Sequence, residues 1–501
     1  MVRSPRLASP LAALLACGDV EPGRCPGPLD ASITLAALEA HLAALADIGE
    51  QHGQTRAIGT AGFAASAELV AARLAAAGLV VTRQPFTILD FELTDAPRFA
   101  QLGPDPREYV LDQDYRVARF SGSGDVAAQV VAVDLSLGPA NDSTSGCEPD
   151  DFAEFVAGSV ALIQRGGCYH DDKLANAAAA GAAAVVLFNQ GDTPERSVLY
   201  TPRLSPGRAT IPVVGVAYDL GVALDAAIAG GLELHLSIQG RAIERTTENI
   251  LAETSGPASE PVIMVGAHLD SVPAGPGIND NGSGTAAVLE LGLQLARCDL
   301  PRRVRLALWG AEELGLLGSE HYLATLDDAD RDRIALYLNL DMIASPNPAR
   351  LIYDGDGSAF GEPGPAGSAE LEAAFAGWFA ARGLATGETA FDGRSDYGPF
   401  IARGIPAGGL FTGAEGRKSA DEVAAFGGEA EIAYDPCYHA ACDDRDNYDP
   451  TALLDNTRAV AHVVETFASR VEPFVPAPAP RAHARPAPAR PHAHACEDSA
   501  D

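Results

Sequence analysis

The sequence predicts an α/β protein with a mostly parallel central sheet flanked by helices and interrupted by a smaller inserted α/β domain. After Thr246, apolar runs of strand length alternate with helical stretches, in the order PVIMVGA, TAAVLELGLQLAR, RVRLALW, LGLLGSEHYLATL and ALYLNL. Such alternation produces a parallel sheet. Near the N-terminus, AALEAHLAALADI is apolar at helical spacing, and SAELVAARLAAAGLVVTRQPF changes from helix to strand after Gly78. These segments predict the start of the same domain.

The length of the chain, 501 residues, favours two or three folded units rather than one core. Between about Thr94 and Gly240 the pattern changes to short strands, AAQVVAVDL and SVALIQRG, plus one Ala-rich helix, KLANAAAAGAAAVVLFN. The final residues are rich in Pro, Ala, Arg and His, a composition that cannot build a core. We therefore expect an export signal and linker at 1–30, a discontinuous main domain at 31–93 and 241–471, an inserted domain at 94–240, and a disordered tail at 472–501.

Charge and hydropathy restrict the partners and the compartment. The formal net charge of −33 would repel nucleic acid. The first residues, MVRSPRLASPLAALLACGD, have the pattern of an export signal, and no other segment approaches the ~18 apolar residues that span a bilayer. Cys17 ends this run in a position that resembles a lipoprotein cleavage site, so lipid anchoring and release both stay open. We expect a secreted or cell-envelope monomer without nucleic-acid partners.

Eight cysteines suit an oxidising compartment if they pair. Two pairs are close in sequence, Cys147 with Cys168 and Cys437 with Cys442. These spacings predict two disulfides, whereas Cys25, Cys298 and Cys496 have no obvious partner.

Residues that can bind metal follow three of the predicted strands. His268, Asp270 and Asp280 lie in GAHLDSVPAGPGINDNGSG, which begins where PVIMVGA ends. Ligand sites in open α/β sheets lie at the carboxyl ends of strands, and imidazole nitrogen is a good zinc donor. A carboxylate two residues after the histidine suits the other ring N–H, which makes Asp270 a supporting candidate. The other candidates at strand ends are Glu312 and Glu313 after RVRLALWG, and Asp341 in NLDMI.

Each element alone has a plainer explanation. Glutamate is favoured in the first turn of a helix, near the positive end of the dipole. The segment DPCYHAACDD, which places Tyr438 and His439 between two cysteines, is compatible with a structural bridge and an incidental histidine. The joint order of His, Asp, Glu-Glu, Asp and His at successive strand ends is not explained by independent coincidences. We therefore interpret the set as a metal site.

The chain resembles metallopeptidase family 28, the co-catalytic zinc aminopeptidases, and within it the secreted bacterial leucyl-type enzymes. The resemblance rests on HLDSV…NDNGSG, GAEELGLLGS, NLDMI and CYH…CD, and covers roughly 35–93 and 244–471. It implies the zinc exopeptidase fold and two zinc ions per chain. In that pattern Asp280 is the bridging carboxylate, His268 and Asp341 complete one zinc, and His439 and Glu313 complete the other.

The resemblance also implies catalytic roles. Two zinc ions about 3.5 to 4 Å apart lower the pKa of a shared water, whose proton a carboxylate must accept. Glu312 matches the catalytic glutamate of the family, and Asp270 supports the site. Tyr438 resembles the phenol that stabilises the oxyanion, with a packing role as the alternative. Arg394 in GRSDYGPF either contacts the substrate or forms an ion pair with Asp392 or Asp396.

Two further segments resemble known features. The segment GSVALIQRGGCYHDDKLANAAAAGAAAVVLFNQ is similar to a protease-associated (PA) domain, which implies a Cys147–Cys168 disulfide and no catalytic residues in the insert. His170 in this segment is expected to be an ordinary surface residue. Near the C-terminus, four acidic residues form either a calcium site, as in some relatives, or a solvated loop: Asp443, Asp444, Asp446 and Asp449.

These observations predict a zinc-dependent aminopeptidase that hydrolyses the first bond of peptides with a free N-terminus, preferring large apolar N-terminal residues. A carboxypeptidase or a glutaminyl cyclase on the same scaffold is the alternative enzyme. A receptor-like relative that has lost catalysis is a further alternative, although all five ligand positions and Glu312 are present here.

Overall fold

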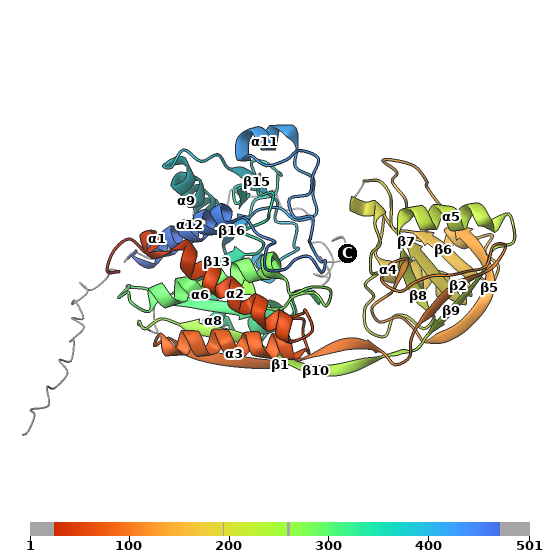
Figure 1. Ribbon diagram of the computed structural model, residues 1–501, viewed down its shortest axis with the longest axis horizontal. Coiled ribbons are helices and arrows are strands. Elements are labelled where there is room, and N and C mark those ends of the chain that lie inside the picture. The colour runs from red at the N-terminus through yellow and green to blue at the C-terminus, as the bar shows by residue number, and fades with distance from the viewer. Residues whose placement is uncertain (1–24, 194, 258–260, 471–501) are drawn as a thin grey trace, which may run out of the picture.

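The structure is a computed structural model that describes residues 25–193, 195–257 and 261–470, so Cys17, Cys496 and the predicted tail lie outside the described residues. It contains two eight-stranded sheets, each accompanied by helices. The sheets lie in two lobes joined by a long two-stranded ribbon (Figure 1). We call the part from β2 to β9 the insert lobe and the rest the main lobe. The predicted α/β class with a smaller inserted α/β unit is confirmed.

The main sheet has the strand order β1-β10-β12-β11-β13-β16-β14-β15. Its centre is parallel, because β11 pairs in parallel with β12 and β13, and β13 with β16. Every residue of β11 is buried, as expected for a strand covered on both faces. The strands are β1 (Val80–Leu93), β10 (Gly240–Glu253), β11 (Val262–His268), β12 (Val304–Trp309), β13 (Ile334–Leu340), β14 (Leu351–Tyr353), β15 (Gly387–Thr389) and β16 (Ala407–Phe411).

Helices cover both faces of this sheet. On one face, Val265, Leu306 and Leu338 pack in a large core cluster with α2, α3, α6, α9 and α12. On the other, Trp309 and Tyr337 pack with α7 and α10. The helices are α1 (Leu29–Ser32), α2 (Leu35–Gln51), α3 (Ala61–Ala76), α6 (Gly284–Leu295), α7 (Leu317–Thr325), α8 (Asp328–Asp332), α9 (Ser368–Ala380), α10 (Tyr397–Ile401), α11 (Ala420–Phe426) and α12 (Pro450–Ala468).

The insert lobe contains the second sheet, in the order β3-β2-β9-β5-β6-β7-β8-β4. Its central strands β5 to β8 pair in parallel, and their buried Val, Leu and Ile side chains form the lobe's own core. Its elements are β2 (Arg98–Gly103), β3 (Arg107–Glu108), β4 (Tyr115–Val117), β5 (Gly124–Val133), β6 (Val160–Gln164), α4 (His170–Ala179), β7 (Ala184–Phe188), β8 (Val213–Val216), α5 (Tyr218–Ile228) and β9 (Glu233–Ile238).

The prediction of one Ala-rich helix over KLANAAAAGAAAVVLFN is wrong. Helix α4 ends at Ala179, and Gly181 then adopts a φ of 82° that favours glycine. The following AVVLF is a fully buried strand, β7. The many alanines concealed this break, because alanine suits a helix while the β-branched residues after Gly181 favour a strand. The lobe also has a second helix, α5, that the sequence did not predict.

The ribbon of β1 and β10 joins the lobes. The two strands pair antiparallel over their full length, from Val80 opposite Glu253 to Leu93 opposite Gly240. Figure 1 shows them leaving the main sheet and running to the insert lobe. No helix within the described ranges is long and apolar enough to cross a membrane.

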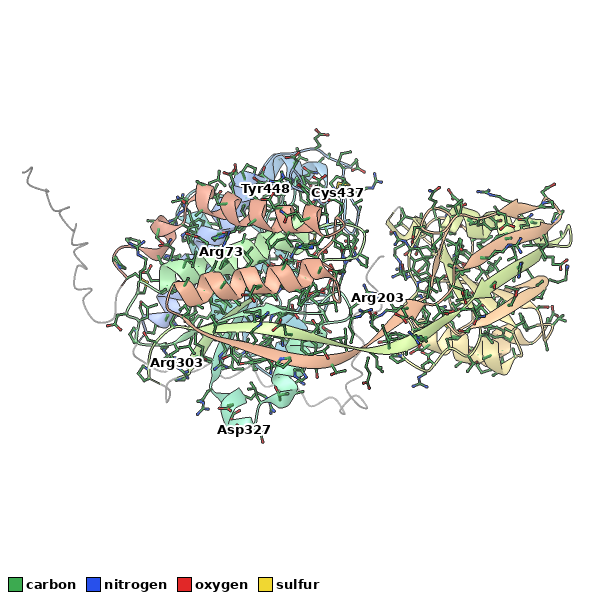
Figure 2. The ribbon with its side chains drawn as sticks, turned by 60° about the horizontal axis from the view of Figure 1, so that its bottom comes forward. Arg73, Arg203, Arg303, Asp327, Cys437 and Tyr448 are labelled. Atoms are coloured by element: carbon green, nitrogen blue, oxygen red, sulfur yellow. A yellow bond between two sulfur atoms is a disulfide. The ribbon has the colours of Figure 1, made fainter. Side chains whose placement is uncertain are left out.

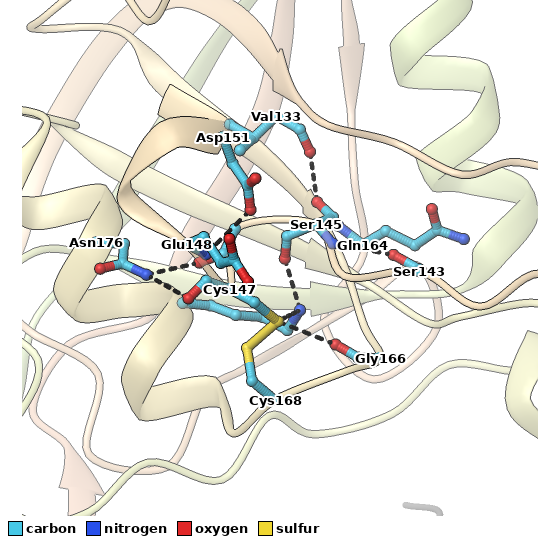
Figure 3. Close-up of a disulfide and its surroundings, with 12 residues drawn as sticks. Val133, Ser143, Ser145, Cys147, Glu148, Asp151, Gln164, Gly166, Cys168 and Asn176 are labelled. Atoms are coloured by element: carbon cyan, nitrogen blue, oxygen red, sulfur yellow. Dashed lines mark hydrogen bonds between the residues drawn. A yellow bond between two sulfur atoms is a disulfide. The ribbon is translucent and has the colours of Figure 1, made fainter. Parts of the chain in front are cut away.

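Three disulfides link the described cysteines. Cys147–Cys168 and Cys437–Cys442 are the pairs expected from the sequence. The first is reinforced by Asn176, whose amide donates to the carbonyl of Cys147 at 2.9 Å (Figure 3). The third joins Cys25 to Cys298 across a sequence separation of 273 residues. No local spacing signals a pair so distant, which is why the sequence left both cysteines without a partner.

Candidate metal centre and active site

The predicted ligands meet at the carboxyl edge of the parallel strands. His268 is the last residue of β11, and Asp341 follows the end of β13. Glu312 and Glu313 lie in the turn between β12 and α7, not in the first helical turn that the dipole argument favoured. His439 comes from the loop closed by the Cys437–Cys442 disulfide. Residues far apart in sequence therefore converge because parallel strands end at one edge.

Two groups of potential ligands share one carboxylate. The Nε2 atom of His268 lies 3.1 Å from Oδ1 of Asp280 and 3.3 Å from Oδ1 of Asp341. The Nε2 atom of His439 lies 3.0 Å from Oδ2 of Asp280 and 3.2 Å from Oε2 of Glu313. Asp280 thus presents one oxygen to each group. Either group can offer a metal ion three ligand atoms.

The chemistry of these groups fits metal ions. His268 Nδ1 lies 3.0 Å from the carbonyl oxygen of Asp270, so its N–H is used there and Nε2 keeps a lone pair facing the carboxylates. Within the described part of the chain, Oε1 of Glu313 and Oδ1 of Asp341 are buried without a hydrogen-bond partner. Buried carboxylate oxygens without donors are costly unless a cation neutralises them.

The pKa shifts of these side chains support the same conclusion. Burial raises the pKa of Glu313, and burial raises the pKa of Glu312 well above its usual value. Burial lowers the pKa of His268, but the charges of Asp341 and Glu312 outweigh it and hold that pKa well above the ordinary value. Cations bound at these groups would therefore displace protons.

The loop that carries Asp280 needs glycine at one position. Gly277 has a φ of 62°, and a Cβ there would lie 2.2 Å from the carbonyl oxygen of Asp280. Asp443 holds the other side of this loop, because its carboxylate accepts the backbone N–H groups of Asn279 at 2.8 Å and Asp280 at 3.0 Å. Tight chain folding thus brings Asp280 back beside His268.

Arg56 is a support for this loop that the sequence did not reveal. Its side chain is fully buried and donates to the carbonyl oxygens of Leu269, Pro276 and Gly277 at 2.5 to 2.6 Å. Arginine can satisfy three carbonyls in fixed directions through its planar fork. The residue lies between two N-terminal helices, about two hundred positions from the loop, without a motif of its own.

Asp270 occupies the expected position but uses different atoms from those expected. Its carboxylate accepts the backbone N–H groups of Glu312 at 3.2 Å and Glu313 at 3.4 Å. The ring N–H of His268 is directed to the Asp270 backbone oxygen at 3.0 Å, while the nearest carboxylate oxygen lies 3.8 Å away. Asp270 thus links the histidine ligand to the glutamate pair.

Glu312 is close to the centre but outside the two groups that share Asp280. Its side chain is 8% exposed, and its Oε2 lies 3.9 Å from Nε2 of His268. It also belongs to a third set of neighbouring donors with His268 and Glu313. The carboxylate is therefore near enough to act on a molecule bound at the centre.

Tyr438 and Arg394 line the same cavity. The Tyr438 ring stacks on His439 with centroids 3.8 Å apart, and Arg394 Nη2 donates to its hydroxyl oxygen at 3.3 Å. Arg394 forms an ion pair at 2.9 Å, but with Glu415. The predicted partners were wrong, because Asp392 accepts the Arg394 backbone N–H and Asp396 is buried against Ser319.

The four acidic residues of the C-terminal loop have separate roles. Asp443 is buried behind Asp280, Asp449 caps α12 by accepting the N–H of Ala452 at 2.7 Å, and Asp444 and Asp446 are exposed. Among the described residues they form no common group of potential metal ligands. The expectation of a solvated loop fails for Asp443, because its carboxylate is needed by the Asp280 loop.

A small cavity opens onto the centre. Its lining includes the five predicted ligands, Glu312, Tyr438 and Arg394. One lining residue comes from the insert lobe, Arg203, which the sequence did not predict. Fold and site together define a metallohydrolase whose two histidine–carboxylate groups face a common cavity.

Comparison with known proteins assigns this class to a family. The sequence profile of Peptidase family M28 matches residues 249–464, and that of the PA domain matches 126–224. An aminopeptidase from Pseudomonas aeruginosa is 45% identical over 455 residues, which cover 89% of this chain and 84% of the relative. Leucine aminopeptidase 2 of Trichophyton equinum is 44% identical over 331 residues, 66% of each chain.

Solved structures agree. BSAP, a zinc aminopeptidase from Bacillus subtilis, superposes with a TM-score of 0.65 at 27% identity, covering 87% of this chain and 95% of that one. The aminopeptidase from Aneurinibacillus sp. strain AM-1 has the same fold, with a TM-score of 0.70 at 24% identity over 90% and 98% of the two chains. The chain belongs to peptidase family M28. It is a metallo-aminopeptidase with a PA domain within the chain, which confirms the resemblance seen in the sequence.

Proposed function

We propose that this enzyme binds two zinc ions and removes N-terminal residues, preferring large apolar ones, from peptides. The observation that carries the proposal is the sharing of Asp280 between the groups His268–Asp280–Asp341 and Asp280–Glu313–His439. Two zinc ions so bound would activate a water and polarise the scissile carbonyl. The zinc aminopeptidase BSAP and the leucine aminopeptidase 2 relatives support the choice of metal and of substrate.

Glu312 is the general base in this proposal. Its carboxylate accepts the proton of the attacking water and later donates it to the leaving amine nitrogen. Burial raises the pKa of Glu312 above the usual value of a carboxyl group, which favours acceptance of the proton of the water. Asp270 positions it through the backbone N–H of Glu312.

Tyr438 is the oxyanion donor. Its hydroxyl oxygen accepts a hydrogen bond from Arg394, and the hydroxyl group lines the cavity, where it can donate to a developing negative charge. Arg394 is held in turn by Glu415. In this assignment Arg394 orients the phenol.

Substrate recognition starts from charge. Asp280, Glu313 and Asp341 would serve as metal ligands, and Glu312 adds a further carboxylate to the cavity that can pair with the free ammonium group of a peptide N-terminus. An acetylated N-terminus lacks this charge. We therefore assign the unblocked N-terminus as the feature that selects substrates.

The setting of the enzyme follows from its cysteines and charge. Three disulfides are typical of an exported protein. We assign the enzyme to the secreted or cell-envelope fraction, with the main domain at 31–93 and 241–471 and the insert at 94–240. Its partners are peptides, since the net charge of −33 opposes nucleic-acid binding.

The test is an assay of the purified enzyme with free and N-acetylated aminoacyl p-nitroanilides, before and after chelation and zinc restoration. We expect cleavage of the free substrates alone, fastest for leucine, with loss on chelation and recovery with zinc. Equal cleavage of blocked substrates would reject the aminopeptidase assignment. Activity indifferent to chelation would reject the metal.

A further inference from the structure

The insert lobe brings a cationic side chain to the active site. Arg203 lines the cavity together with the metal-ligand residues, and it is the lining residue that β2 to β9 contribute. Figure 2 shows Arg203 where the insert lobe faces the main lobe. A residue some sixty positions before the first ligand therefore faces the same space as Glu312 and His439. The resemblance to a PA domain did not predict that a residue of the insert would line the active-site cavity.

The position of Arg203 is fixed through Arg119. The backbone N–H of Arg119 donates to the carbonyl of Pro202 at 3.0 Å, and Arg119 and Arg203 form a strand-like bridge. The Arg119 side chain then crosses to the main lobe, where it donates to the carbonyl of Leu314 at 3.4 Å and to that of Leu89 at 3.2 Å. Leu314 directly follows the glutamate pair. Arg203 is thereby tied to the turn that carries the proposed general base.

The insert core holds the same segment from the other side. His170 is buried and makes a hydrogen bond to the backbone of Arg203. The expectation that His170 is an ordinary surface residue is therefore wrong: it begins α4 and packs near the Tyr200 ring, with centroids 5.8 Å apart. Pro202 and Leu204, on either side of Arg203, are buried. The guanidinium is presented from a fixed backbone.

The chemistry of the cavity indicates what this cation binds. The carboxylates that line the cavity suit metal ions and a peptide ammonium group, whereas a guanidinium fork matches a carboxylate. Arg203 is tied through Arg119 to the turn of Glu312, the residue that must reach the leaving nitrogen.

We propose that Arg203 binds a carboxylate on the leaving side of the scissile bond, so that the enzyme favours short peptides whose C-terminal carboxylate reaches the insert lobe. This inference rests on the proposed aminopeptidase function and specifies its substrate class. An acidic side chain just after the scissile bond is the other source of the same group. In both cases Arg203 determines specificity without taking part in bond cleavage.

The test compares Arg203→Gln and Arg203→Lys with a matched control, Arg208→Gln, an exposed position five residues further along the same segment. The full-length enzyme is assayed with Leu-Gly, Leu-Gly amide, Leu-Glu amide, Leu-Gln amide and leucine p-nitroanilide. For Arg203→Gln we expect KM to rise about tenfold for Leu-Gly, with changes below about twofold for Leu-Gly amide and the anilide. Lysine should restore part of the affinity, and the control should match the wild type.

Each outcome distinguishes the inference from the underlying function. A loss confined to Leu-Gly identifies the C-terminal carboxylate, and a loss confined to Leu-Glu amide identifies an acidic side chain. Equal changes for all substrates, or none, would show that Arg203 merely connects the lobes and would overturn the inference. Failure of the wild type to cleave leucine p-nitroanilide would instead reject the aminopeptidase assignment.

Discussion

The hydroxyl of Ser395 donates a hydrogen bond of 2.6 Å to Oδ2 of Asp341. The Ser395 oxygen in turn accepts a hydrogen bond from the side-chain amide of Asn339 at 2.8 Å. The Oδ1 atom of Asn339 accepts a hydrogen bond from the Tyr337 hydroxyl at 3.1 Å. Trp309 Nε1 donates to the Tyr337 oxygen at 2.8 Å. This buried chain connects one face of the sheet to a proposed zinc ligand. It fixes one oxygen of Asp341 and leaves the other directed at the centre.

Replacement of Ser395 by alanine should weaken zinc binding. Loss of a group that orients a ligand typically costs 10- to 100-fold in metal affinity, and we expect about tenfold here because Asp341 keeps its contact with His268. The measurement is zinc retention against a competing chelator, followed by metal analysis. Ser123→Ala, which removes a serine hydroxyl that donates to the carbonyl of Gly240 at 3.0 Å, is the control. Equal retention in both variants would show that this hydrogen bond does not position Asp341.

Replacement of Arg56 by methionine should both destabilise the fold and weaken zinc binding. Three buried carbonyls would lose their donors, at a cost of at least about 3 kcal/mol in the free energy of unfolding. The same change at Arg241, whose side chain is 67% exposed in its ion pair with Glu92, should cost less than about 1 kcal/mol. Urea unfolding measures the free energy of unfolding of both variants. A similar loss in the two variants would contradict the role given to Arg56.

Replacement of Tyr438 by phenylalanine separates its two proposed roles. If the hydroxyl stabilises the oxyanion, kcat should fall by about 10-fold or more with little change in KM, because the interaction forms in the transition state. If Tyr438 only packs on His439, phenylalanine keeps the ring stack and activity stays near that of the wild type. Steady-state kinetics on leucine p-nitroanilide decide between the two.

His170 should make stability depend on pH. Burial, followed by the charges of Arg165 and Lys173, lowers its pKa from 6.5 to about 3. Between pH 6.5 and pH 3, the unfolded chain therefore binds a proton at His170 that the folded chain does not bind. The folded state has its full stability from this residue above pH 6.5. This stability is lost as the pH falls towards 3, by about 1.4 kcal/mol per pH unit.

The comparison for this prediction is His170→Gln, which cannot gain that proton. The difference in unfolding free energy between wild type and variant, measured from pH 7 downwards, should shrink as the pH falls. Parallel stability curves would contradict the assigned burial. Hydrogen exchange of the insert lobe would place the effect in α4.

The sequence predicted the parts of the site that follow from periodicity. His268 and Asp341 could be placed because buried strands with hydrophobic runs end there, and the carboxyl ends of parallel strands meet at one edge. The alternation of strands and helices after Thr246 and the change from helix to strand after Gly78 follow from the hydrophobic pattern as well.

Other features depend on contacts between distant segments. Arg56 supports the Asp280 loop, Arg203 reaches the cavity from another lobe, and Cys25 pairs with Cys298, yet none of these lies in a local pattern. The ion pair of Arg394 was predicted wrongly, because Asp392 and Asp396 are its neighbours in sequence. Glu415 comes close to Arg394 only in the folded chain. Long-range partners of this kind become visible when the chain is folded.

The most direct test of the central claim compares Glu312→Gln with Glu313→Gln. Both remove one charge from adjacent positions, but Glu312 is assigned to proton transfer and Glu313 to metal binding. Zinc content and turnover of leucine p-nitroanilide are measured on the same preparations. We predict that Glu312→Gln keeps about two zinc ions and loses turnover, whereas Glu313→Gln loses zinc. Loss of zinc from Glu312→Gln, with zinc retained in Glu313→Gln, would contradict the assignment.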